Sequence, residues 1–149
     1  MSGSRTIAQR HADVLAALER QGDAWLATAS PGGSPHLIAV SAAWDGSTVT
    51  IATRSGSPTA GNLASTGRAR LALGSPDDVV MLDVEVMEEA AATPDAPAGR
   101  AFTAAMGWDP AELGTDWAYY RLRPVRIQVY RGYGELEGRD VMRDGAWLG

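Results

Sequence analysis

The sequence predicts a mainly β protein, an antiparallel barrel or sandwich with flanking helices. Three observations indicate this class. Short apolar and β-branched runs recur along the 149 residues, turns rich in Gly, Pro, Asp and Ser separate them, and few stretches have helical spacing. Three consecutive runs are joined by turns too short for a crossover. They therefore form an antiparallel meander, which is how small barrels and sandwiches begin.

The N-terminal third begins with an amphipathic helix and continues as this meander. Ile7, Val14 and Leu18 belong to an apolar series with helical spacing over residues 5–21, and Gly22 ends the helix. Apolar runs separated by Gly-containing turns follow. The expected elements are a strand over residues 25–30, a turn over 31–35, a strand over 36–44, a turn over 45–47 and a strand over 48–53.

The next connection combines the end of a strand with the start of a helix. Thr53 and Arg54 end the third strand, Ser57 has the residue type of a helix N-cap, and Pro58 suits the first helical position. Hydroxyls, a guanidinium and unpaired backbone N–H groups together form a site suited to a phosphate. An ordinary capped connection with a solvated arginine explains the same residues, so both interpretations stay open.

The remaining elements follow from the same signals. The helix after Ser57 runs over residues 58–65 and ends at Gly67, and Pro124 marks a bulge or an edge between two strand pieces within residues 117–133. The other expected elements are strands over 68–74 and 79–87, a connection over 90–97, a helix over 98–106 ending at Gly107, a capped turn or short helix over 108–113 and a hairpin around Asp144 and Gly145.

Composition limits the class of protein. The length of 149 residues and 45% hydrophobic content predict a single domain over residues 1–149. The absence of cysteine excludes disulfides and a cysteine nucleophile, and the N-terminal residues lack the apolar core of a secretion signal. We expect a soluble, cytoplasmic protein. A net charge of −5 argues against nucleic acid or an anionic membrane as the main partner.

No motif of a protein-borne catalytic centre is present, so no catalytic residue is predicted. Neither His11 nor His36 has a second ligand at metal spacing, which predicts no metal site. A nucleophile elbow, a phosphate-binding P-loop and a dinucleotide-binding glycine motif are all missing. Five tryptophans and four tyrosines are enough to line a pocket for a flat ring, although core packing explains most of them. This pattern favours chemistry carried by a bound cofactor.

Two stretches resemble motifs of one family. The run from Thr53 through Ser57 and Thr59 to Leu63, with Leu71 eight residues beyond, resembles the Thr-x-x-x-Ser-x-Lys-x-x-x-Leu run of the pyridoxamine 5′-phosphate oxidase-like, flavin-binding split-barrel family. Residues 122–132 resemble its Leu-x-Pro-x-x-Ile-Glu-x-Trp-x-Gly strand. The sequence Gly-Trp-Asp-Pro at 107–110 and the C-terminal residues 138–148 look most like an actinobacterial branch related to deazaflavin-dependent oxidoreductases.

The resemblance implies a six-stranded antiparallel split β-barrel with flanking helices, assembled as a homodimer with cofactor sites at the subunit interface. Tyr130 stands at the position of the ring-stacking Trp, and Arg139 lies where an arginine closes over the flavin. The positions that the resemblance assigns to cofactor binding are Val40, Ser41, Thr53, Arg54, Ser57, Thr59, Gly61, Asn62, Tyr130 and Arg139.

Two departures from the family pattern change the expected function. Thr59 replaces the lysine that contacts the phosphate, which leaves Arg54, Arg68 or Arg70 to supply a positive charge. Residues 37–42 are uncharged where the oxidases carry substrate-binding cations, so we do not expect pyridoxamine phosphate oxidation.

The first hypothesis is therefore a small redox enzyme that transfers a hydride to or from a small conjugated substrate. Its cofactor would be the deazaflavin coenzyme F-420 in preference to FMN, because the branch resemblance favours the deazaflavin. The alternative is a non-catalytic split-barrel dimer that binds a cofactor or serves as a scaffold, with a site degenerate at Thr59. Haem binding is disfavoured because neither histidine lies in a tail suited to axial ligation.

Overall fold

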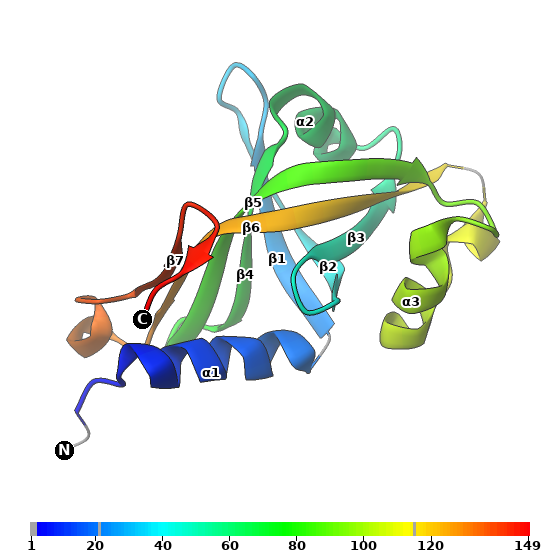
Figure 1. Cartoon of the computed structure of the whole chain (residues 1–149). Coiled ribbons are helices and arrows are strands. Elements are labelled where there is room, and N and C mark those ends of the chain that lie inside the picture. Colours follow the sequence, from blue (N-terminus) through cyan, green and yellow to red (C-terminus); the bar gives the residue numbers. More distant parts are fainter. Residues whose placement is uncertain (1–2, 21, 115) are drawn as a thin grey trace.

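Six antiparallel strands close into a barrel around the main hydrophobic core (Figure 1). The computed structural model describes residues 3–20, 22–114 and 116–149. The order around the barrel is β3-β2-β1-β4-β5-β6, and β6 pairs with β3 to close it. This confirms the predicted six-stranded antiparallel barrel. The strands are β1 (Gly22–Ala29), β2 (Pro35–Trp44), β3 (Val49–Arg54), β4 (Arg68–Ser75), β5 (Asp78–Ala91) and β6 (Trp117–Tyr130).

The ladder between β3 and β6 closes the barrel. It runs in continuous register from Val49 opposite Leu122 to Arg54 opposite Trp117. The inward side chains of both strands are fully buried, among them Ile51 and Leu122. Burying an aliphatic side chain of this size contributes about 1.5–3 kcal/mol, so the packing of the interior reinforces the closure.

The ladder between β2 and β3 is much shorter. It pairs Ala42–Trp44 with Val49–Ile51, next to the turn that joins the two strands. The remainder of β2 pairs with β1 instead, and the remainder of β3 pairs with β6. The two strands therefore separate beyond Ala42 and Ile51, and the barrel is split there.

Three α-helices flank the barrel: α1 (Ile7–Glu19), α2 (Pro58–Thr66) and α3 (Pro97–Met106). In Figure 1, α1 lies beneath the barrel, α2 lies over its upper end and α3 lies beside the far ends of β5 and β6. As predicted, Ser57 caps α2 and Gly67 ends it in the left-handed conformation. None of the helices in the described parts of the chain is long and apolar enough to cross a membrane.

Helix α1 is shorter than the expected range of residues 5–21. It begins at Ile7 because Thr6 forms a capping box with Gln9: the Thr6 hydroxyl accepts from the Gln9 N–H, and the Gln9 side chain accepts from the Thr6 N–H. Its last helical residue is Glu19. Gln21, where the expected helix ended, lies outside the described residues.

One strand prediction was wrong in its length and another in its continuity. Strand β5 continues to Ala91, beyond the expected end at residue 87, because residues 88–91 pair with residues 118–121 of β6. Strand β6 is continuous rather than two pieces. The bulge that was one of the two alternatives at Pro124 is confirmed by a register shift there, since Asp83 lies opposite Arg126 whereas Val84 lies opposite Pro124.

The C-terminal residues fold back along β6. A 3₁₀ turn, η2 (Tyr133–Glu135), leads to the hairpin of β7 (Asp140–Arg143) and β8 (Ala146–Trp147). Asp144 and Gly145 form its turn, with φ of 53° and 78°, which confirms the predicted hairpin.

A buried ion pair ties the N-terminus to η2. Arg5 Nη2 lies 2.6 Å from Glu135 Oε1, and both side chains are almost fully buried. The Arg10 guanidinium is also buried and donates to the carbonyl oxygens of Val129 and Glu135. The hydrogen bond from Arg5 lowers the pKa of Glu135 to about 2, although burial opposes this shift. The ionised carboxylate is therefore part of the folded structure.

This ion pair predicts acid sensitivity. The pKa of Glu135 is lower in the folded protein than its ordinary value of 4.5. The contribution of the ionised carboxylate to the free energy of unfolding is therefore present above pH 4.5 and is lost as the pH falls toward 2. We expect Glu135→Gln to lower the free energy of unfolding by about 3 kcal/mol at neutral pH, because Arg5 then loses its buried partner. Denaturant titrations should show the difference from wild type narrowing as the medium becomes acidic. A pH-independent difference would contradict this assignment, and Glu19→Gln, at an exposed carboxylate, is the control.

Candidate functional site

A groove of about 410 Å³ lies where β2 and β3 separate. Its volume falls within the range of small-molecule sites. Residues of β2, the end of β3, Ser57 before α2, two tryptophans and Asp23 of β1 line it. Five of the ten predicted cofactor-binding residues lie on this groove: Val40, Ser41, Thr53, Arg54 and Ser57.

One end of the groove is a polar corner. The hydroxyl oxygens of Thr53 and Ser57 are 3.2 Å apart, and Ser57 Oγ accepts from the Ala60 N–H at 3.1 Å. The Arg54 side chain is exposed, with its Cζ 5.8 Å from the centre of the Trp117 ring. Two hydroxyls and a guanidinium beside the N-terminus of a nine-residue helix suit an anion such as a phosphate.

An aromatic wall lines the groove next to this corner, since Trp117 is paired with Arg54. Trp108 and Trp117 pack edge to face with 5.4 Å between ring centres, and Phe102 packs edge-on against Trp108 at 5.3 Å. Trp108 Nε1 also donates to Ser41 Oγ at 3.2 Å. The wall therefore combines apolar ring surface with one hydrogen bond to β2.

The connection between β5 and β6 carries Trp108 to the groove. Phe102 of α3 is buried against Tyr119 of β6, which anchors the helix to the barrel. Gly107 ends α3 with φ of 78°, and Asp109 caps the following 3₁₀ turn, η1 (Pro110–Leu113). Sequence analysis identified the Gly-Trp-Asp-Pro motif but not its place in the site, and the aromatic residue between two capping signals was the available clue.

Three predicted residues belong to α2 and do not line the groove. The Thr59 side chain is buried, 1% exposed, and its hydroxyl has no hydrogen-bond partner among the described residues. Asn62 Nδ2 donates to Thr28 Oγ1 of β1 at 3.0 Å, and Gly61 is exposed. At the position where the resemblance leads us to expect a phosphate-contacting lysine, this chain therefore has a buried side chain.

The three arginines considered as replacements for that lysine differ in their surroundings. Arg54 lies on the groove, whereas Arg68 and Arg70 line a separate depression between β1 and the β4–β5 pair. Arg70 Nε also lies 2.6 Å from Asp83 Oδ1. Arg54 is therefore the one of these three that is placed to bind an anion in the groove.

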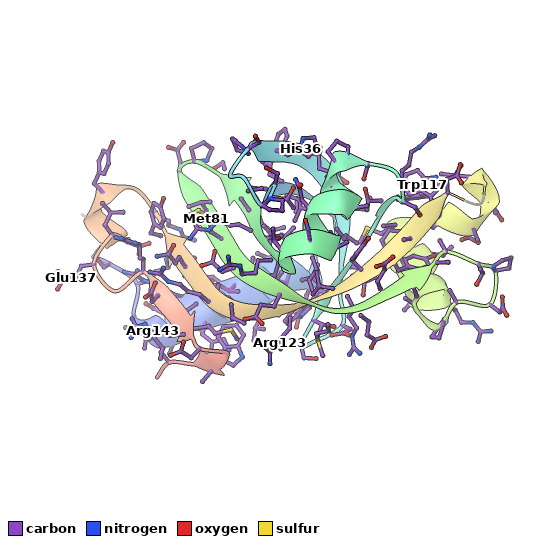
Figure 2. The ribbon with its side chains drawn as sticks, turned by 90° about the horizontal axis from the view of Figure 1, so that it is seen from above. His36, Met81, Trp117, Arg123, Glu137 and Arg143 are labelled. Carbon is purple, nitrogen blue, oxygen red and sulfur yellow. The ribbon has the colours of Figure 1, made fainter. Side chains whose placement is uncertain are left out.

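The last two predicted residues, Tyr130 and Arg139, lie at the opposite end of β6. The Arg139 carbonyl accepts from the Val129 N–H at 2.9 Å, which places it beside Tyr130. Figure 2 shows Trp117 and Glu137 at opposite ends of the molecule. An extended strand rises about 3.3 Å per residue, so the ends of β6 are roughly 40 Å apart along its length. A single chain does not bring all ten residues into one site.

The closed barrel with one short ladder is the fold of FMN-binding split-barrel proteins. Residues 11–125 match the family model of pyridoxamine 5′-phosphate oxidase. The chain therefore belongs to that family, which confirms the resemblance found in the sequence.

Solved structures of several relatives share this fold. An F420 reductase is 19% identical with a TM-score of 0.63, and the match covers 75% of this chain and 93% of the reductase chain. A heme-binding protein from Mycobacterium smegmatis is 22% identical with a TM-score of 0.64, and the match covers 88% of this chain and 56% of the heme-binding protein. A pyridoxamine 5′-phosphate oxidase-related, FMN-binding protein from Nostoc punctiforme is 13% identical with a TM-score of 0.57, covering 85% and 87%. No curated protein sequence matches the chain.

The surroundings of Ser57 and Thr59 predict opposite effects of removing their hydroxyls. Ser57→Ala should lower the free energy of unfolding by about 1 kcal/mol, because the first turn of α2 loses its cap. Thr59→Val keeps the side-chain shape and removes a buried polar atom without a partner, so we expect no loss or a gain of up to about 1 kcal/mol. Denaturant titration of both variants measures this. A clear loss for Thr59→Val would show that its hydroxyl has a partner in solution.

Proposed function

We propose that the groove binds a flavin-type cofactor, coenzyme F-420 in preference to FMN, and that the protein transfers a hydride to or from a small conjugated substrate. The observation that carries the proposal is the meeting of an anion-binding corner and an aromatic wall in one groove of small-molecule size. Family membership supports a redox role.

The residues present fit such a group. Thr53, Arg54 and Ser57 would hold its phosphate, while Trp108 and Trp117 would pack along the ring. The separated edges of β2 and β3 add backbone groups that can bind the polar edge of a ring. When bound, the cofactor would supply the ring atom that accepts or releases the hydride, and the protein would orient the ring and exclude water.

A preference for F-420 rests on how the negative charge would be held. The lysine expected at Thr59 is missing and Arg54 is exposed, so the corner would hold a phosphate with Arg54 as the one cation among the described residues that line the groove. A long anionic tail can be bound by scattered arginines and amides instead. Residues 37–42 on β2 carry no charge, which argues against the pyridoxamine phosphate substrate of the family's oxidases.

A homodimer would complete the site. The partner's Tyr130 and the partner's Arg139 would then reach the groove that this chain's own Tyr130 and Arg139 do not reach. Trp25 and Leu37 support an interface, because they lie on the outward faces of β1 and β2 and are 55% and 61% exposed. The two are diagonal neighbours, because Trp25 lies opposite Ala39 and Leu37 opposite Ala27. Large apolar side chains exposed on one face of adjacent strands are typical of an interaction surface.

The alternative is a dimer of the same fold without catalysis. The buried, unpartnered hydroxyl of Thr59 favours it, since the residue that contacts the phosphate in the family has become part of the interior here. Under this alternative the groove would bind a cofactor weakly or not at all.

Titration with each cofactor tests the first proposal. We expect wild type to quench the fluorescence of F-420 or FMN, and Arg54→Ala to weaken binding about 10-fold or more, because a hydrogen bond to a charged group contributes roughly 1.5–3 kcal/mol. Arg123→Ala, on β6 with its guanidinium paired to Glu85, is the control and should bind as wild type does.

Three results would contradict the proposal. Wild type that binds neither cofactor would exclude it, and gain of FMN binding by Thr59→Lys would then establish the alternative. A haem absorbance band in the purified protein would assign the groove to a different group.

The proposed dimer is tested through its apolar surface. Light scattering should give twice the chain mass of 15.7 kDa for wild type. Leu37→Arg should shift the protein to monomer and weaken cofactor binding together, because the partner's residues are then lost from the site. Met87→Arg, at a 49% exposed apolar residue of β5 that does not line the groove, is the control for adding a charge to the surface. A monomeric wild type that binds cofactor would contradict the shared site.

A further inference from the structure

We infer that Ser41 is an oriented hydrogen-bond donor to the ring bound in the groove, and that Trp108 is the residue that positions it. This inference rests on the proposed function, because it concerns the same groove. It assigns a role to the one hydrogen bond that joins the aromatic wall to β2.

The direction of this hydrogen bond is fixed by chemistry. An indole N–H is a donor and cannot accept, so Trp108 Nε1 donates and Ser41 Oγ accepts across the 3.2 Å contact. A serine hydroxyl has one hydrogen to donate and rotates to suit its neighbours. With Trp108 on the acceptor side, the Ser41 hydrogen must point away from the indole.

The groove is where an acceptor for the Ser41 hydrogen would lie. Ser41 is half-buried on β2, opposite Asp23 of β1, and lies on the lining of the groove just past the last pair between β2 and β3. Among the described residues, no side chain or carbonyl accepts a hydrogen bond from its hydroxyl. A ligand that carries an acceptor on the edge next to β2 would satisfy it.

Trp108 is held firmly enough to impose this orientation. Its ring packs edge-on against both Phe102 and Trp117, at 5.3 and 5.4 Å, and the Asp109 cap fixes the following turn. Rotation of the indole would break two ring contacts and the hydrogen bond together. The donor is therefore directed before any ligand arrives, so binding incurs little cost of reorganisation.

The chemistry of the donor indicates the class of ring. Flavin and deazaflavin rings carry carbonyl oxygens on their polar edge, and either one can accept from a single directed hydroxyl. Haem also carries acceptors, but they are the carboxylates of its flexible propionate side chains rather than atoms of the ring. A single directed hydroxyl beside the ring therefore fits the carbonyl edge of a flavin-type ring.

Double-mutant binding measurements with FMN and with F-420 test the inference. Ser41→Ala removes the donor, and Trp108→Phe keeps an aromatic ring but removes the Nε1 hydrogen. We expect each single variant to bind roughly 3- to 10-fold more weakly than wild type. The double variant should lose no more affinity than the single variant that binds more weakly. The visible absorption maximum of the bound ring should shift in the same direction in both, whereas Ser41→Thr should retain the wild-type spectrum. Trp147→Phe and Ser65→Ala, which lie away from the groove, are the matched controls.

The outcomes separate this inference from the proposed function. Wild-type binding with unchanged affinity and spectrum in Ser41→Ala overturns the inference and leaves the proposed function standing. Additive losses in the double variant overturn the positioning role of Trp108. Failure of wild type to bind either cofactor overturns both. If Trp108→Phe does not fold, as judged by thermal unfolding, the comparison of Ser41→Ala with Ser41→Thr decides the role of the hydroxyl.

Discussion

The pairing of β3 with β6 is the constraint on which the rest of the structure depends. Strand β3 has six residues, and all six pair with β6, whereas only three pair with β2. The same short strand therefore closes the barrel on one edge and leaves it split on the other. The pairs with β2 are retained at the end next to the turn, where side chains hold the chain in place.

That turn is fastened by hydrogen bonds to Asp45. Its carboxylate accepts from the Ser47 N–H and from both the N–H and the hydroxyl of Thr48, and Arg121 of β6 donates to the same hydroxyl. Burial by itself would raise the pKa of Asp45, but these hydrogen bonds and the nearby charge of Arg121 lower it to about 2. Because one end of the β2–β3 pair is fixed, the strands separate only at the other end, beside the helix start at Ser57.

Local chemistry made part of the site predictable. The residue types at Ser57, Pro58 and Gly67 determine where α2 begins and ends, since capping depends on neighbours within a few positions of the sequence. The strand end at Thr53 and Arg54 was recognisable for the same reason. The family resemblance then placed Val40 and Ser41 beside them. The structure brings these two residues to one groove with Thr53, Arg54 and Ser57.

The rest of the site depends on contacts between distant parts of the chain, which local patterns do not encode. The extension of β5 to Ala91 comes from pairing with β6. That extension determines where along the barrel the connection to α3 begins. Trp108 reaches Ser41 across 67 positions of sequence. The orientation of Thr59 was equally hidden, because a threonine in the first turn of a helix faces solvent or interior according to how the helix lies on the barrel.

The placement of Trp108 on the connection between two long strands has an evolutionary consequence. Strands β5 and β6 remain paired whatever joins their far ends, so mutations and length changes in α3 and η1 leave closure of the barrel intact. Relatives can therefore diversify the wall that faces the ligand while inheriting an unchanged scaffold. Differences in ligand selectivity among members of this fold are then expected to arise mainly from the connection between β5 and β6.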